Sequence, residues 1–248
     1  MNSSFRSALA IAISIVLAST IGSWAFLSGK KLNQTIEVTG SAKKRIKSDL
    51  IIWQVSVETE SASLPEAYTK LIRDVDKTKA FLVSHGVPEN VIAISAVDTT
   101  PIRPPSRPNY SENGPQQTFA GAVLGYHLKQ SLSVRSSEVD KITAVSRQVT
   151  ELVNQGLLLT SEAPEYLYTH LAETKVEILA SAARDAKERA QQIASSTGSR
   201  IGEIREASMG VLQITAADSV DVSGMGENDT KSLDKDITAV VHVTFAID

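Results

Sequence analysis

Alternation of apolar and polar positions predicts most of the strands of this chain. In residues 51–59 the apolar side chains fall on every second position, which is typical of a half-buried strand. Residues 237–247 keep the same period of two over a longer stretch. Similar patterns predict further strands over residues 35–40, 91–97, 123–134, 157–160 and 204–215, the first ending in a turn at Gly40.

Apolar positions at helical spacing predict three helices between these strands. The first begins at Ser63, with Glu66 three residues later as a capping box, and ends at Gly86. The second begins at Ser137 and ends before Gly156. The third and longest covers residues 168–197. Its alanines allow close packing against a sheet or another helix, and they stand at positions 180, 182, 183, 186, 190 and 194.

The order of these elements predicts an α+β fold. After the first short strand the order is βαββαβ, as in a ferredoxin-like unit, and a further αββ follows. We expect mostly antiparallel sheets with the helices on one face. The sequence leaves open whether the two βαββ units share one sheet or form separate lobes.

An uncharged apolar run covers residues 7–28, with Arg6 before it and Lys30 and Lys31 after it. About 20 apolar residues in a helix cross a membrane, so we expect a transmembrane anchor. A cleaved signal peptide, with the mature chain starting near Phe26, is the alternative. We therefore divide the chain into an anchor or signal peptide with its linker, residues 1–33, and a domain over residues 34–248.

Four segments resemble the SIMPL-domain family of bacterial envelope proteins. They are residues 36–40, residues 47–51, the pair Gly125–Tyr126, and the alanine-rich stretch 180–194 with Gly198 and residues 201–202 after it. Ser48 stands where proline is common in the family. The resemblance implies an exported α+β protein, ring-like oligomers in some relatives, and a link to oxidative-stress tolerance. It implies no catalytic residues.

Two features of the sequence give opposing indications of the side of the membrane on which the domain lies. Lysines and arginines after the apolar run favour the cytoplasm, but long folded domains are exported despite such charges. Because of the resemblance, we expect a single-pass protein of the inner membrane with its body on the periplasmic side. A soluble periplasmic protein after signal cleavage is the alternative.

Residue patterns for known chemistry are absent from the sequence. The chain has no cysteine, no Gly-x-Ser-x-Gly, no phosphate-binding loop and no histidine pair at metal-binding spacing. The net charge of −3, with no basic stripe, gives no support to nucleic-acid binding. We therefore expect no enzyme activity, no cofactor, and no catalytic, cofactor-binding or metal-binding residue. An enzyme of unrecognised type remains an alternative.

Three clusters have both a functional and a plain structural interpretation. His127 and His242 would be neighbours if their strands pair, although a sheet-surface role is the simpler interpretation. Residues 43–47 could meet anionic lipid, or form a solvated turn. The loop 216–236 could bind calcium or simply be solvated, and its acidic residues are Asp218, Asp221, Glu227, Asp229 and Asp234.

We expect the protein to act through protein association, self-association and unidentified envelope proteins included. The alanine face of residues 168–197 and the strand 237–247 are the candidate contact surfaces, with intramolecular core as their other interpretation. The alternative function is a small-ligand or peptide-binding module with a groove lined by Trp53 or Tyr126. The Pro-rich segment 101–117 is expected to be a long loop at a hairpin tip.

Overall fold

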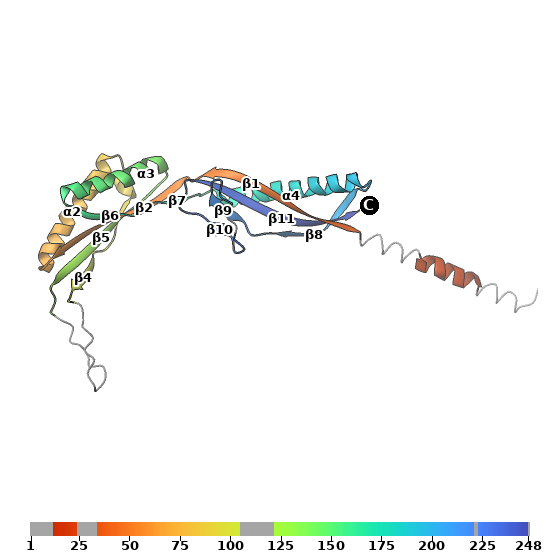
Figure 1. Ribbon diagram of the computed structural model, residues 1–248, viewed down its shortest axis with the longest axis horizontal. Coiled ribbons are helices and arrows are strands. Elements are labelled where there is room, and N and C mark those ends of the chain that lie inside the picture. The colour runs from red at the N-terminus through yellow and green to blue at the C-terminus, as the bar shows by residue number, and fades with distance from the viewer. Residues whose placement is uncertain (1–11, 24–33, 105–121, 221–222, 248) are drawn as a thin grey trace, which may run out of the picture.

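The computed structural model describes residues 12–23, 34–104, 122–220 and 223–247. Its body consists of two mostly antiparallel sheets in two lobes that lie end to end, one covered by a single helix and the other by two helical segments (Figure 1). The inserted lobe comprises residues 50–167 and interrupts the terminal lobe, which comprises residues 35–47 and 171–247. The prediction of an α+β fold with antiparallel sheets is confirmed, and the two sheets are separate.

The terminal lobe joins the two ends of the body in one sheet. Strand β1 (Thr35–Lys47) pairs along its whole length with β11 (Asp234–Ile247). On its other side β11 pairs with β8 (Ile201–Met209) and with β9 (Gln213–Ala216), which in turn pairs with β10 (Glu227–Asn228). Helix α4 (Leu171–Ser196) packs against β1 and β11. Among the described helices, α4 is the one that covers the sheet of the terminal lobe.

The inserted lobe has the strand order of a ferredoxin-like unit. In its sheet, β2 (Leu50–Ser61) and β5 (Gly125–Ser136) form the centre. Beside β5 lie β3 (Ile92–Ile94) and β4 (Asp98–Ile102), and beside β2 lie β6 (Leu158–Ser161) and β7 (Glu165–Leu167). The order β3-β5-β2-β6 with antiparallel neighbours is that of the predicted βαββαβ unit.

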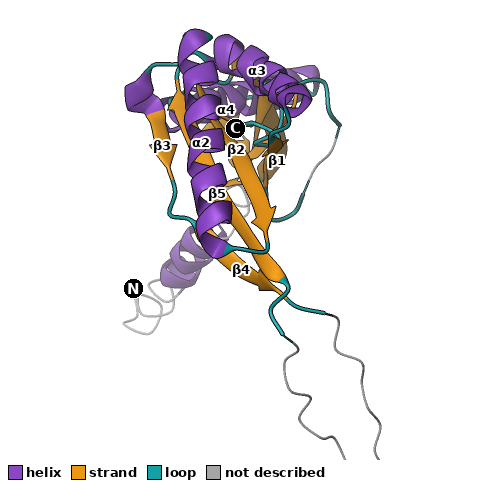
Figure 2. Ribbon diagram, turned by 90° about the vertical axis from the view of Figure 1, so that its left-hand side faces the viewer, coloured by secondary structure: helices purple, strands orange, loops and turns teal. Residues whose placement is uncertain are grey.

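Two helical segments lie on one face of this sheet, where they enclose a core (Figure 2). They are α2 (Leu64–Ser84), and α3 (Val139–Gln148) with its 3₁₀ continuation η2 (Val149–Gln155). A short 3₁₀ turn, η1 (Glu89–Val91), precedes β3. The apolar positions of β2, Ile51, Trp53, Val55 and Val57, are all buried under the helices. The period of two in this strand therefore predicted the core correctly.

Close backbone approach defines the core of the terminal lobe. Ala182, Ala186 and Ala190 form part of a buried stripe at intervals of four residues along α4. Opposite them lies Gly40, where an added Cβ would overlap the backbone of Ala182 and Ala186. The predicted close packing is confirmed for Ala182, Ala186, Ala190 and Ala194, where it is intramolecular, whereas Ala180 and Ala183 are exposed.

Several predicted boundaries are wrong. Strand β1 does not turn at Gly40 but continues to Lys47, so residues 43–47 are part of a strand rather than a turn. The predicted strand 204–215 is two strands, because β8 ends at Met209 and β9 begins at Gln213. Pro101 lies inside β4, an outer strand where a missing N–H is tolerated. The rest of the Pro-rich segment, from residue 105 to 117, falls outside the described residues.

The described part of the apolar run 7–28 is a helix over residues 12–23. Residues 7–11 and 24–28 fall outside the described residues. Among the helices that the structure describes, none has the length and apolar character needed to cross a membrane.

Candidate functional site

Among the described residues, the candidate histidines, acidic residues and aromatic residues named in the sequence analysis do not assemble into a metal or ligand site. Trp53 is 1% exposed and its Nε1 donates to Ser161 Oγ at 3.1 Å, so it belongs to a core and cannot line an open groove. Tyr126 packs against the same core. His127 lies in the inserted lobe beside Glu58 and Glu60, whereas His242 lies in the terminal lobe.

The two histidines are therefore not neighbours, because β5 and β11 belong to different sheets. Thr39 Oγ1 lies 3.0 Å from His242 Nδ1, a contact across β1 and β11. In the part of the chain that the structure describes, no three metal-ligating side chains converge.

Carboxylates after β9 hold the chain in place rather than facing a common point. Asp218 Oδ1 accepts a hydrogen bond of 2.5 Å from Arg45, and Asp229 accepts from the backbone of Lys231 and Ser232. Burial favours the neutral form of Asp229, but its hydrogen bonds, led by the one with the Ser232 side chain, and the nearby charge of Lys235 together keep its pKa below the usual range. Asp221 lies outside the described residues.

Asp236 pairs with two cations of the basic cluster of β1, Lys43 and Arg45. Its buried carboxylate accepts hydrogen bonds from Arg45 Nε at 2.8 Å and Nη2 at 3.1 Å, and Lys43 Nζ lies 2.8 Å away. These contacts, led by the hydrogen bond from Arg45, hold the pKa of Asp236 well below its usual range despite its burial. Lys43 and Arg45 are therefore engaged inside the protein.

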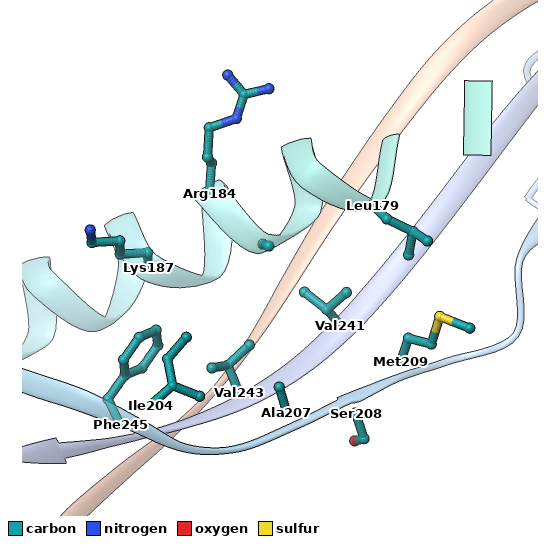
Figure 3. A pocket seen from close by; sticks show the side chains of 11 residues that line it. Leu179, Arg184, Lys187, Ile204, Ala207, Ser208, Met209, Val241, Val243 and Phe245 are labelled. Carbon is teal, nitrogen blue, oxygen red and sulfur yellow. The ribbon is translucent and has the colours of Figure 1, made fainter. Parts of the chain in front are cut away.

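An open apolar groove lies between α4 and β8, and we call it the α4–β8 groove (Figure 3). Its cavity volume is about 580 Å³. The lining residues come from three elements and are Leu179, Ala183, Arg184, Lys187, Ile204, Ala207, Ser208, Met209, Val241, Val243 and Phe245. A second hollow of about 530 Å³ shares Leu179 and Met209 with it and continues toward Leu171.

The groove exists because α4 is centred over β1 and β11 and leaves β8 uncovered. Ile204 and Met209 point from β8 toward the helix, and they are 60% and 69% exposed (Figure 3). Leu179 points down from α4 to the floor, which β11 completes with Val241 and Val243. Large exposed apolar patches are a common feature of interaction sites and ligand-binding grooves.

The β1 edge and the β8 edge of the terminal-lobe sheet differ in their contacts with α4. At the β1 edge, the Ser41 N–H donates to Asp185 Oδ2 at 2.8 Å, and Lys44 pairs with Glu177 at 2.6 Å. The hydrogen bond from Ser41 and the contact with Arg189 lower the pKa of Asp185. Beyond β8, no strand partner is found among the described residues. The free edge and the groove therefore lie on the same side of the lobe.

Cations line the outer side of the groove. Lys187 lies at the groove and Lys175 at the second hollow, whereas Arg184 points from α4 away from the floor (Figure 3). Within the described residues none of the three takes part in an ion pair, and Arg184 donates only to its own helix, to Ala180 O and Ser181 Oγ. The groove thus combines an apolar floor with unpaired positive charge.

Sequence reasoning did not predict this groove, although the two candidate contact surfaces that it named overlap the groove in part. Most of the alanines of α4 are buried against the sheet and β11 is paired on both sides, but Ala183 and the side chains of Val241, Val243 and Phe245 line the groove. A signal was present in α4, where Lys175, Leu179, Ala183 and Lys187 recur every four residues beside the buried stripe.

Comparison with known proteins decides the family. The family model described as "SIMPL: Protein of unknown function (DUF541)" matches residues 36–245. The chain belongs to the SIMPL family. The matched range includes both lobes of the body, so the SIMPL domain comprises the terminal and the inserted lobe together. This confirms the family resemblance seen in the sequence.

Other comparisons add no functional information. No curated protein matches the chain. Among solved structures, a crystal structure of a hydantoinase/carbamoylase family amidase from Burkholderia ambifaria is similar to part of it, with 12% identity and a TM-score of 0.26. The similarity covers 47% of this chain and 28% of the amidase chain. At that TM-score it carries no argument about fold or function.

Proposed function

We propose that this SIMPL protein is a non-catalytic, membrane-anchored protein of the cell envelope that acts by protein association, self-assembly included. The observation that carries the proposal is the α4–β8 groove, where Ile204 and Met209 are exposed beside a free strand edge. Apolar floors with polar or charged rims are typical of protein interfaces. Neither the groove nor the clusters discussed above bring together groups suited to acid–base or nucleophilic chemistry.

The anchor and the location are part of the same proposal. The uncharged run 7–28 would hold the protein in the inner membrane, with the SIMPL domain on the periplasmic side. A cleaved signal, giving a soluble periplasmic protein, is the competing form of the proposal. The family resemblance adds a role in envelope and oxidative-stress tolerance, for which peroxide survival of a deletion strain is the test.

A second candidate function is binding of a small ligand or peptide. The groove volume of about 580 Å³ favours it, because ligand sites commonly have cavities of this size lined by apolar side chains. This ligand site is not the groove beside Trp53 that the sequence suggested. The burial of Trp53 excludes an open groove there.

The test uses the full chain purified from membranes in detergent. Intact mass spectrometry reports whether residue 1 is retained, and light scattering over a range of concentrations reports the assembly mass. A retained residue 1 and an assembly mass that is a multiple of 26.6 kDa would support an anchored, self-associating protein. A chain that starts near Phe26 contradicts the anchor, and one chain per particle at all concentrations contradicts self-association.

Variants then connect the assembly to the groove. The double substitution Ile204→Asp with Met209→Asp places charge on the floor, so we expect a loss of assembly with an unchanged circular dichroism spectrum. The matched control is Val83→Asp with Val153→Asp, since these side chains are also apolar and exposed but lie in the inserted lobe. Loss of assembly in both pairs equally would exclude the groove as the contact.

A further inference from the structure

The sheets of the two lobes are covered by different numbers of helices. In the inserted lobe, α2 and the α3–η2 segment lie on one face of the sheet and enclose its core. In the terminal lobe, α4 covers β1 and β11, and the place beside it over β8 is the α4–β8 groove. A sheet buries its apolar face under a layer of helices, and here that layer is incomplete.

The two flanks of α4 explain which side is open. The flank toward β1 carries Glu177 and Asp185, which bind Lys44 and the Ser41 N–H. The flank toward β8 carries Leu179 and Ala183 between Lys175 and Lys187, and neither lysine has an ion-pair partner in the part of the chain that the structure describes. Ala183 on the helix and Ala207 on β8 are small, so a helix backbone could approach both closely.

We propose that the α4–β8 groove takes an amphipathic helix of a partner protein, with acidic residues along the flank that faces α4. This inference rests on the proposed function, since it names the kind of partner that associates at the groove. The apolar face of the partner helix would cover Ile204, Met209 and Leu179. Its acidic flank would meet Lys175 and Lys187, which lie at the two hollows.

The groove also sets the length of the partner helix. From Leu171 to Lys187 the two hollows follow α4 for 16 residue steps, about 24 Å at 1.5 Å per residue. A helix of about 16 residues fills that length. Helix-in-groove recognition of this kind needs apolar anchors at i, i+3 or i+4, and i+7.

Addition of a strand at the free edge is disfavoured by β8 itself. Its pairing with β11 shifts register between Thr244 and Phe245, and Glu203, Arg205 and Glu206 are exposed along it. Bulges and charges are the features by which edge strands resist pairing with another chain. The helical occupant therefore fits this edge better than an extended one.

The experiment uses the full chain in phospholipid nanodiscs and three fluorescent 16-residue peptides, with empty nanodiscs as the blank. The first peptide is a leucine–alanine amphipathic helix with glutamates on its flanks, the second has lysine for each glutamate, and the third has the composition of the first in strictly alternating order. We expect the first to bind with a gain in helical circular dichroism and to weaken as salt is raised.

Two pairs of variants test the site. Lys175→Glu with Lys187→Glu should weaken binding of the acidic peptide about tenfold and allow binding of the basic one, whereas Lys70→Glu with Arg73→Glu, exposed on α2, should change neither. Ala183→Trp fills the groove and should abolish binding. Gln192→Trp, at an exposed position of the same helix that lines neither hollow, should leave binding intact.

The outcomes separate this inference from the proposed function. Equal binding of the acidic and basic peptides, or tighter binding of the alternating one, overturns the acidic helix but leaves association at the groove in place. If no peptide binds but Ala183→Trp disrupts the assembly of the full chain, the occupant of the groove is a second copy of this chain. That result also overturns the acidic partner helix. If no peptide binds and no groove variant changes the assembly mass, both the inference and the proposed function fail.

Discussion

Gly40 marks the tightest packing between α4 and β1. A Cβ at this position would overlap the backbone of Ala182 and Ala186, which a small rotation of a side chain cannot relieve. The sequence showed a glycine after alternating residues, and the same pattern fits a turn. Only the long-range pairing of β1 with β11 reveals that the strand continues and that the glycine serves close packing.

Substitution of Gly40 by alanine should therefore destabilise the terminal lobe. We expect Gly40→Ala to lower the free energy of unfolding by about 1–3 kcal/mol, as overpacking does in well-packed cores. Urea unfolding followed by circular dichroism measures it. Gly224→Ala is the control, because a Cβ at Gly224 has no neighbour within 4 Å. Equal stability of the two variants would contradict the packing described.

Asp236 predicts a dependence of stability on pH. Hydrogen bonds, above all the one from Arg45, lower its pKa in the folded state. Stability from such a group is complete above its unfolded pKa of about 4 and is lost as pH falls toward the lower folded pKa. Between pH 5 and pH 2 the wild type should lose more stability than Asp236→Asn.

The matched control for Asp236 is Asp76→Asn, since Asp76 is an exposed carboxylate of α2 with no ion pair among the described residues. This variant should follow the wild type through the whole pH range. A pH profile of Asp236→Asn that coincides with the wild type would show that the cluster with Arg45 and Lys43 does not form.

At the scale of elements, α4 shows what a sequence pattern can and cannot predict. Its length, its end near Gly198 and its buried alanines follow from spacing alone. The strands 51–59 and 237–247 were equally clear, because one face of each is buried. Which flank of α4 stays open was not predictable, since it depends on β8 pairing with β11 beyond the reach of the helix.

The two faces of α4 should respond differently to the same substitution. Ala186→Leu adds volume where α4 meets Gly40, and we expect a loss of about 1–3 kcal/mol in the free energy of unfolding. Ala183→Leu adds the same atoms in the open groove and should change it by less than about 0.5 kcal/mol. Thermal unfolding of the two variants, measured in parallel, tests this prediction. If Ala183→Leu were the more destabilising substitution, the groove would not lie on the Ala183 flank of α4.

At the scale of the molecule, one lobe is inserted into the other. The chain passes from β1 to β2 through Ser48 and Asp49 and returns from β7 to α4. Backbone hydrogen bonds join the lobes there, from Ser48 N to Leu233 O and from Tyr166 N to Thr230 O. Lys235 Nζ, buried at this junction, donates to the carbonyl oxygens of Tyr166 and Asp229, and burial lowers its pKa.

The insertion explains why the sequence predicted the helices and strands better than it predicted which strands pair with each other. The βαββαβ order of the inserted lobe is local and was recognisable. The sheet of the terminal lobe joins β1 to β11 across about 200 residues, as the pairing of Thr39 with His242 illustrates. The separation of His127 from His242 and the existence of the groove both follow from that long-range pairing.

The central claim is that the SIMPL domain associates with another protein at the α4–β8 groove. The most direct measurement introduces a photo-reactive residue in place of Ala183 in the full chain and illuminates intact cells. We predict covalent protein adducts from position 183 and none from the same residue at Lys70, an exposed position on α2. Adducts that are absent at position 183, or equally abundant at Lys70, would contradict the account.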